Sequence, residues 1–223
     1  MLRILVSLIL PLVLAACSVS GEAARATPQS LPYGAWEIGL FAPSYMEVWV
    51  ESVDVTDLRG VAFERAHGGV PSVSNPSGNS GNPVGWPGRP GVGKTRPMTG
   101  IGLPVEVSVR WQSLAEPQTY NVRIDIPAWA RSEMVAGHPS VCRFDGKHIT
   151  AYRYAITLGL APGGIAKAWL TGACLEPIEI GRFEGAVEPK GPYGGKSGGE
   201  YYRPPSEHAQ NYLDTHEIPF DSW

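Results

Sequence analysis

The sequence has little that would assign it a chemistry. Its net charge is −3, so it lacks the positive excess that nucleic-acid-binding domains carry. Its five histidines are scattered and form no His-x-x-x-His pair of the kind that ligates zinc. Ser80 and Ser197 lie in glycine-rich stretches, which are typical of solvated turns. These observations predict a protein that is not an enzyme and that has no cofactor and no metal.

One enzymatic alternative stays open. Two carboxylates that cleave a glycosidic bond need not be close in sequence. Glu47 and Glu51 would point to the same side of one strand, which is also the pattern of an exposed strand face. A hydrolase therefore remains an alternative to a binding protein.

One segment matches the residue pattern of a nucleotide-binding motif but lacks the flanking strand and helix that the motif needs. Gly88 to Thr95 matches every fixed position of the P-loop. A working P-loop needs a strand before it and a helix that opens at the Lys-Thr pair. Here Pro83 precedes the stretch, and Pro97 and Pro104 follow it, so no helix can continue. We expect no nucleotide at this position.

No apolar stretch is long enough to cross a bilayer as a helix. Ile4 to Leu14 is apolar and short, follows Arg3 and contains Pro11, as in a secretory signal peptide. We therefore expect residues 1–16 to be a signal peptide that is removed on export.

The end of this stretch, Leu14-Ala15-Ala16-Cys17, resembles the lipobox of bacterial lipoproteins. The resemblance implies that Cys17 becomes the first mature residue and carries the lipid. Ser18 is not the aspartate associated with inner-membrane retention. The expected location is the outer membrane, with the protein facing the periplasm.

Cysteine is scarce, with three in the chain. Apart from Cys17, only Cys142 and Cys174 remain, and export would place both in an oxidising compartment. We predict a disulfide between them, against the alternative of two free buried thiols. Closing a loop of about 32 residues stabilises a fold by about 3–4 kcal/mol in the loop-entropy model.

The composition and the apolar pattern predict a β-rich domain. Hydrophobic residues make up 43% of the chain, enough for a core, and 27 glycines and 21 prolines indicate many turns. We expect a mostly β, antiparallel, sandwich-like domain with one or two short helices and long Gly/Pro-rich loops. A change of phase near Ser52 predicts a β-bulge. Period-two alternation predicts strands at Trp36–Leu40, Met46–Val55, Val105–Trp111, Thr119–Ile126, Ile156–Leu160, Ile165–Leu170 and Ile178–Phe183.

Two short helices complete the expectation. Pro127 suits the first turn of a helix that runs to about Val135. Ser206 is an N-cap for a tail helix that ends at Leu213. The expected organisation is a tether at 17–30, a β domain at 31–184 with a loop insertion at about 68–102, and a Gly-rich linker with a tail at 185–223.

Four of these segments resemble a family of Gram-negative lipoproteins that is known only as a domain of unknown function. The resemblance runs from Tyr33 to Phe183 and implies an immunity protein that blocks a type VI secretion phospholipase effector. It implies no catalytic residue. The segments are Leu40-Phe41-Ala42-Pro43 with Val48-Trp49-Val50; Val105 to Trp111 with Ala115-Glu116 and Tyr120; Leu160-Ala161-Pro162-Gly163-Gly164 with Ala168-Trp169-Leu170; and Ile180-Gly181-Arg182-Phe183.

The candidate partner-binding residues lie in the long loop. Trp86, Arg89 and Arg96 are the types of residue that dominate protein interfaces. The seven tryptophans favour packing of the core, and they leave open an envelope glycan-binding module or a structural lipoprotein as alternatives.

Overall fold

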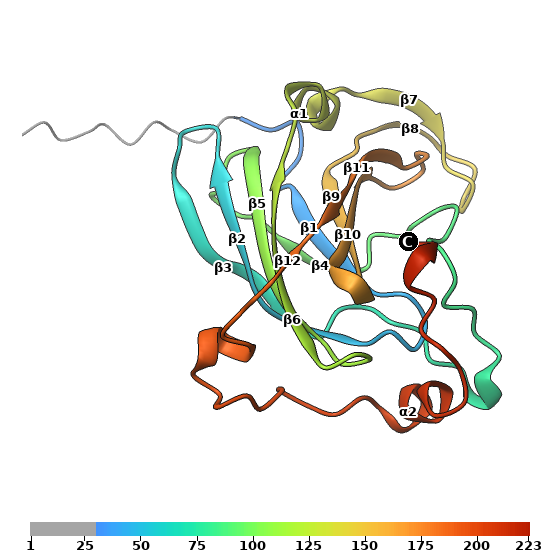
Figure 1. Ribbon diagram of the computed structural model, residues 1–223. Coiled ribbons are helices and arrows are strands. Elements are labelled where there is room, and N and C mark those ends of the chain that lie inside the picture. The colour runs from blue at the N-terminus through green and yellow to red at the C-terminus, as the bar shows by residue number, and fades with distance from the viewer. Residues whose placement is uncertain (1–29) are drawn as a thin grey trace, which may run out of the picture.

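The computed structural model describes residues 30–223, and Cys17, the signal peptide and most of the tether lie outside this part. Two five-stranded sheets face each other across one core (Figure 1). The prediction of a mostly β, largely antiparallel sandwich is confirmed. One pair differs, because the neighbours β1 and β9 run parallel. In order across the first sheet lie β11 (Ile178–Glu184), β10 (Ile165–Thr171), β9 (Ala155–Ala161), β1 (Glu37–Phe41) and β4 (Lys94–Pro97).

The second sheet holds the longest strands. A hairpin of β7 (His138–Val141) and β8 (His148–Ala151) stands apart from both sheets. In order across the second sheet lie β12 (Ala186–Val187), β6 (Gln118–Asp125), β5 (Pro104–Ser113), β2 (Val48–Asp57) and β3 (Ala62–Gly69).

The alternation in the sequence sets which side chains enter the core. On β2, Val48 and Val50 are buried, and so are Val53 and Val55 after the phase changes. The β2–β5 register shifts between Val50 and Ser52, so the predicted bulge is confirmed. The predicted helices are also present, as α1 (Ala128–Val135) and α2 (Glu207–Leu213). The Ser206 side chain accepts a hydrogen bond from the Ala209 amide, as expected of an N-cap.

The irregular region is shorter than the 68–102 expected from the sequence. Its first two residues belong to β3, and β4 interrupts it at Lys94–Pro97. The long loop, defined here as residues 70–93, contains the 3₁₀ turn Ser77–Asn79 and an isolated bridge between Ser72 and Phe41. The alternation missed both strands because β3 and β4 are edge strands and β4 is exposed at every residue. An exposed edge strand needs no apolar face, so it carries no period-two signal.

The long loop lies flat on the outer face of the first sheet. Gly39 and Gly159 remove two side chains from that face. A Cβ on Gly39 would lie 1.7 Å from the carbonyl oxygen of Val92, and a Cβ on Gly159 would lie 2.4 Å from the Trp86 ring. Glycine in a strand interior permits this kind of close approach.

The C-terminal segment, residues 188–223, runs along the lower end of the second sheet in this view and then continues to the long loop (Figure 1). Glu47 accepts hydrogen bonds from Asn75 (2.6 Å) and from the Ser206 amide (2.7 Å). Glu51 accepts hydrogen bonds from Gln112 (2.9 Å) and from the Tyr193 amide (2.7 Å). The two carboxylates are thus structural anchors of the C-terminal segment.

An aromatic contact adds to this attachment. The rings of Trp49 and Tyr202 stack with their centroids 3.4 Å apart, and the Trp49 indole donates to the Tyr193 hydroxyl at 2.7 Å. The burial of one aromatic face against another favours an ordered path for the chain, although this part of the sequence is rich in glycine.

Candidate functional site

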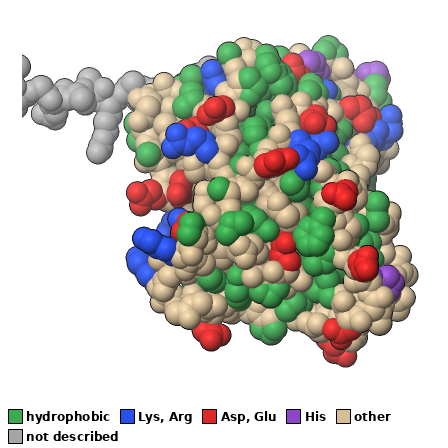
Figure 2. Space-filling model, viewed as in Figure 1, with side chains coloured by type: hydrophobic (Ala, Val, Ile, Leu, Met, Phe, Trp, Pro, Cys, Tyr) green, Lys and Arg blue, Asp and Glu red, His purple; other side chains and the backbone are tan. Residues whose placement is uncertain are grey.

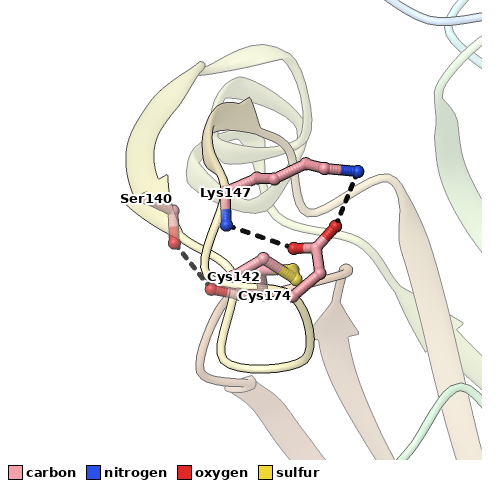
Figure 3. The surroundings of a disulfide bond; sticks show 5 residues. Ser140, Cys142, Lys147 and Cys174 are labelled. Carbon is pink, nitrogen blue, oxygen red and sulfur yellow. Dashed lines mark hydrogen bonds and ion pairs between the residues drawn. A yellow bond between two sulfur atoms is a disulfide. The ribbon is translucent and has the colours of Figure 1, made fainter.

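A disulfide joins two loops at one side of the molecule. Cys142, in the turn between β7 and β8, is bonded to Cys174, in the loop that follows β10, so the predicted pairing is confirmed (Figure 3). The Ser140 hydroxyl donates to the Cys174 carbonyl at 2.8 Å. Lys147 closes the turn, because its amide and its ammonium group both contact Asp145 (Figure 3). We call residues 142–147 the disulfide turn.

The disulfide turn presents one large apolar side chain to solvent. Phe144 is 98% exposed, and its neighbour Arg143 has a side chain that is 79% exposed. Val141, at the end of β7, is half exposed. Single exposed apolar residues are ordinary, but a fully hydrated phenylalanine on a cross-linked turn is a ready anchor for a binding partner.

A cleft of about 560 Å³ separates the disulfide turn from the long loop. Arg89 extends from the long loop and pairs with Glu176, and Arg143 approaches the same carboxylate at 3.6 Å. Both arginines are largely exposed. Two cations on one carboxylate leave a surplus of positive charge at the rim, beside the apolar Phe144 and Leu175 of the cleft.

The structure separates the three residues that the sequence selected. Arg89 lies at the cleft, whereas Trp86 is largely covered and packs against Phe41 and Trp169, with ring centroids 5.6 Å apart in both pairs. Arg96 lies on the edge strand β4, on the side of His67. Arg96 is not among the residues that line the cleft at the disulfide turn.

His67 connects the edges of the two sheets. Its Nδ1 accepts a hydrogen bond from the Gly68 amide at 2.7 Å, so Nε2 carries the proton and donates to the Lys94 carbonyl at 3.0 Å. Burial lowers the pKa of His67, and the nearby charges of Arg96 and Lys94 lower it further. The ring is therefore held neutral as a link between β3 and β4.

The C-terminal residues fix the middle of the long loop. The Trp223 indole donates to the Pro83 carbonyl at 2.9 Å, and Ser222 Oγ accepts from the Gly85 amide at 3.2 Å. Arg182 on β11 donates to the Trp223 carbonyl oxygen at 2.7 Å. The loop is thus ordered by contacts from distant parts of the chain.

Two catalytic motifs lack their structural context. The P-loop match at Gly88–Thr95 runs into β4 where a helix would be required. Gly195 to Gly199 satisfies the Gly-x-Ser-x-Gly pattern around Ser197, the serine that the sequence predicts to be a solvated turn residue. Ser197 follows a 3₁₀ turn and donates to the Pro192 carbonyl, so it lacks the strand-to-helix elbow of a hydrolase nucleophile.

Within residues 30–223, no group of three or more His, Cys, Asp or Glu side chains is arranged to hold a metal ion. The same residues include no helix that is long and apolar enough to cross a membrane. Side chains of both charge signs are mixed over the face in view, without a continuous area of one sign (Figure 2). The disulfide turn and its cleft are therefore the strongest candidate for a binding site in the described part of the chain.

Comparison with known proteins returned one family. The model of DUF2931, described as a protein of unknown function, matches residues 22–221. No curated protein and no solved structure matches the chain.

Proposed function

The chain belongs to the DUF2931 family of proteins of unknown function, and we propose that this member is a lipid-anchored binding protein that blocks a secreted phospholipase effector. In this proposal Cys17 carries the lipid and the domain faces the periplasm from the outer membrane. The protein acts as an immunity protein and not as an enzyme. The observation that carries the binding role is the 98% exposure of Phe144 on a disulfide-linked turn.

Rigidity makes this turn suitable for binding. Ordering a flexible loop on binding costs free energy, and a cross-linked turn has already lost that freedom. The Cys142–Cys174 bond and the Ser140 contact to Cys174 hold Phe144 before any partner arrives. Burial of the whole phenylalanine side chain then contributes about 1.5–3 kcal/mol.

The surface also suggests the chemistry of its partner. A phospholipase surface that fits would offer an apolar pocket for Phe144 and carboxylates for Arg143 and Arg89. A stable interface of about 1,600 Å² is larger than the disulfide turn alone, so it would extend over the cleft to the long loop. Val141, at the end of β7, is half exposed and would add apolar contact.

The test begins with the genes beside this one: a phospholipase-like product that they encode is purified, and its binding to this protein is measured. Full-length protein is purified in detergent, and affinity is measured by titration calorimetry. We expect Phe144→Ala to weaken binding by about 30-fold or more, as loss of an interface anchor does. We expect Arg143→Ala to weaken it less, and to reduce the effect of salt on the association rate.

Two variants control for surface changes elsewhere. Trp129→Ala removes a half-exposed aromatic side chain on α1, and Arg123→Ala removes an exposed arginine on β6. Both should bind normally. The proposal fails if wild-type protein does not bind the effector and does not protect cells from it, or if Phe144→Ala binds as well as Trp129→Ala.

A further inference from the structure

A second hollow lies on the other side of the long loop. It is an open groove of about 460 Å³, within the range of small-molecule sites, between the chain that follows β1 and the two halves of the long loop. Its aromatic wall is Phe41 and Trp86. Its polar side chains are Ser44, Ser72, Ser74 and Asn82.

The polar groups of this groove have unused hydrogen-bonding capacity. The indole Nε1 of Trp86 is buried and has no hydrogen-bond partner among the described residues. The same atom is inaccessible to solvent, so the groove offers its hydroxyls and its amide, and not this N–H, to a ligand. The Ser44, Ser72 and Ser74 hydroxyls also make no hydrogen bond to any described residue, and Asn82 uses only its carbonyl oxygen, which accepts from the Val84 amide.

The groove has no charge. None of the residues that line it is acidic, basic or a histidine. A charged ligand would lose its hydration there without gaining a counter-charge, which is costly. An acyl chain would leave the hydroxyls unpaired, which is also costly. A pyranose ring avoids both costs, because it combines an apolar face with neutral hydroxyl groups.

We infer that this groove binds a neutral saccharide unit through Phe41, Trp86, Asn82 and the three serine hydroxyls. The site is independent of the disulfide turn proposed to hold a protein partner. Sugar from the glycan strand of peptidoglycan and sugar from lipopolysaccharide offer the same neutral ring chemistry. The outcome of the test distinguishes the two sources.

The groove is already formed before a ligand binds. Trp86 is held by Phe41, by Trp169 and by close contact with Gly159. The backbone of Ser72 exchanges two hydrogen bonds with the chain at β1, to Leu40 at 3.0 Å and from Ala42 at 2.9 Å. Binding therefore needs little ordering of the protein, which favours a measurable affinity even for a small ligand.

The experiment uses full-length protein in a zwitterionic detergent, because sugar-based detergents would compete for the groove. The probes are chitotetraose, for the peptidoglycan strand, a neutral lipopolysaccharide core oligosaccharide, and tetragalacturonic acid as a charged control. Binding is followed by saturation-transfer NMR and by tryptophan fluorescence. We expect one of the neutral probes to bind in the millimolar range or tighter, and the charged probe not to bind.

The variants locate the site. Trp86→Phe reduces the aromatic wall of the groove, and Asn82→Ala removes the amide; each should weaken binding up to about tenfold. Trp129→Phe and Phe144→Ala should leave sugar binding unchanged, and the latter separates this site from the protein-binding surface.

Three results would overturn the inference. Neither neutral probe binds at millimolar concentration; the charged probe binds as well as the neutral ones; or Trp86→Phe and Asn82→Ala bind sugar as wild type does. If the two groove variants impair binding of the effector protein and no sugar binds, the groove belongs to the protein interface.

Discussion

The indole of Trp223 donates a hydrogen bond of 2.9 Å to the carbonyl of Pro83, so the last residue of the chain holds a loop 140 residues earlier. Trp223 is 7% exposed and packs in a second apolar cluster with Tyr45, Met46 and Tyr212. The C-terminus is thus part of the packing that orders the long loop beside both candidate sites.

Removal of this side chain should loosen the loop. Trp223→Ala deletes a buried aromatic group and its hydrogen bond, and we expect it to lower the free energy of unfolding by about 3–5 kcal/mol. Denaturant unfolding gives this value, and hydrogen exchange of the amides in residues 82–93 should become faster. Phe220→Ala, at a half-exposed side chain nearby in sequence, should cost much less. Unchanged exchange in the loop of Trp223→Ala would contradict the anchoring role.

The disulfide should matter for stability and for binding. Replacement of Cys142 and Cys174 by serine together should lower the free energy of unfolding by about 3–4 kcal/mol. It should also reduce binding of the effector, because Phe144 would then lie on a freer turn. Denaturant unfolding with and without a reducing agent measures the first effect. Wild-type protein in reductant should match the double variant, and a difference between them would assign the loss to the serine substitutions instead.

The two strand glycines should not tolerate a side chain. Gly39→Ala places a Cβ where the Val92 carbonyl lies, so the long loop must lift from the sheet. We expect a loss of more than about 2 kcal/mol in the free energy of unfolding, since a packed interior has little room for another methyl group. Gly88→Ala and Gly91→Ala in the same loop are matched controls, because a Cβ there meets nothing within 4 Å. Equal stability of Gly39→Ala and these controls would refute the close approach.

Stability should fall in mildly acidic solution because of His67. Its pKa in the folded state is lowered from 6.5 by burial, so below pH 6.5 the unfolded state binds more protons than the folded state. Stability is therefore fully present above pH 6.5 and declines as the pH falls from there toward the lower folded pKa, by at most about 1.4 kcal/mol per pH unit.

The variant His67→Gln should remove that part of the pH dependence. His148→Gln, at an exposed residue of β8, should retain it. The measurement is denaturant unfolding at a series of pH values between 5 and 8, the range in which histidines titrate. The same pH profile for His67→Gln and wild type would show that another group is responsible.

Much of the fold could be predicted from sequence patterns that span only a few residues. The bulge at Ser52, the cap at Ser206 and the strands of the hairpin β5–β6 all follow from residues close together in the chain. The disulfide followed from the small number of cysteines and the expected compartment, which leave few ways to pair them. In each case the interaction joins residues that are close together in the chain, or only a few pairings of cysteines are possible.

Only part of the candidate sites could be predicted from the sequence. Trp86 and Arg89 were selected by residue type, yet only the structure separates their roles, because one faces the aromatic cluster and the other faces Glu176. Phe144 was missed, since a single phenylalanine between two charged residues has no periodic signal. Gly39 and Gly159, in the middle of predicted strands, were the available sign that another segment packs closely there.

The sequence by itself determined the secondary structure of the central strands and the pairing of the cysteines, because alternation, caps and composition act over a few residues. The tertiary structure decided the parallel pairing of β1 with β9, the path of the long loop over the first sheet and the attachment of the C-terminal segment to Glu47 and Glu51. These features depend on contacts between residues that are far apart in the chain. Their energy comes from burial and hydrogen bonds that exist only once both partners are in place.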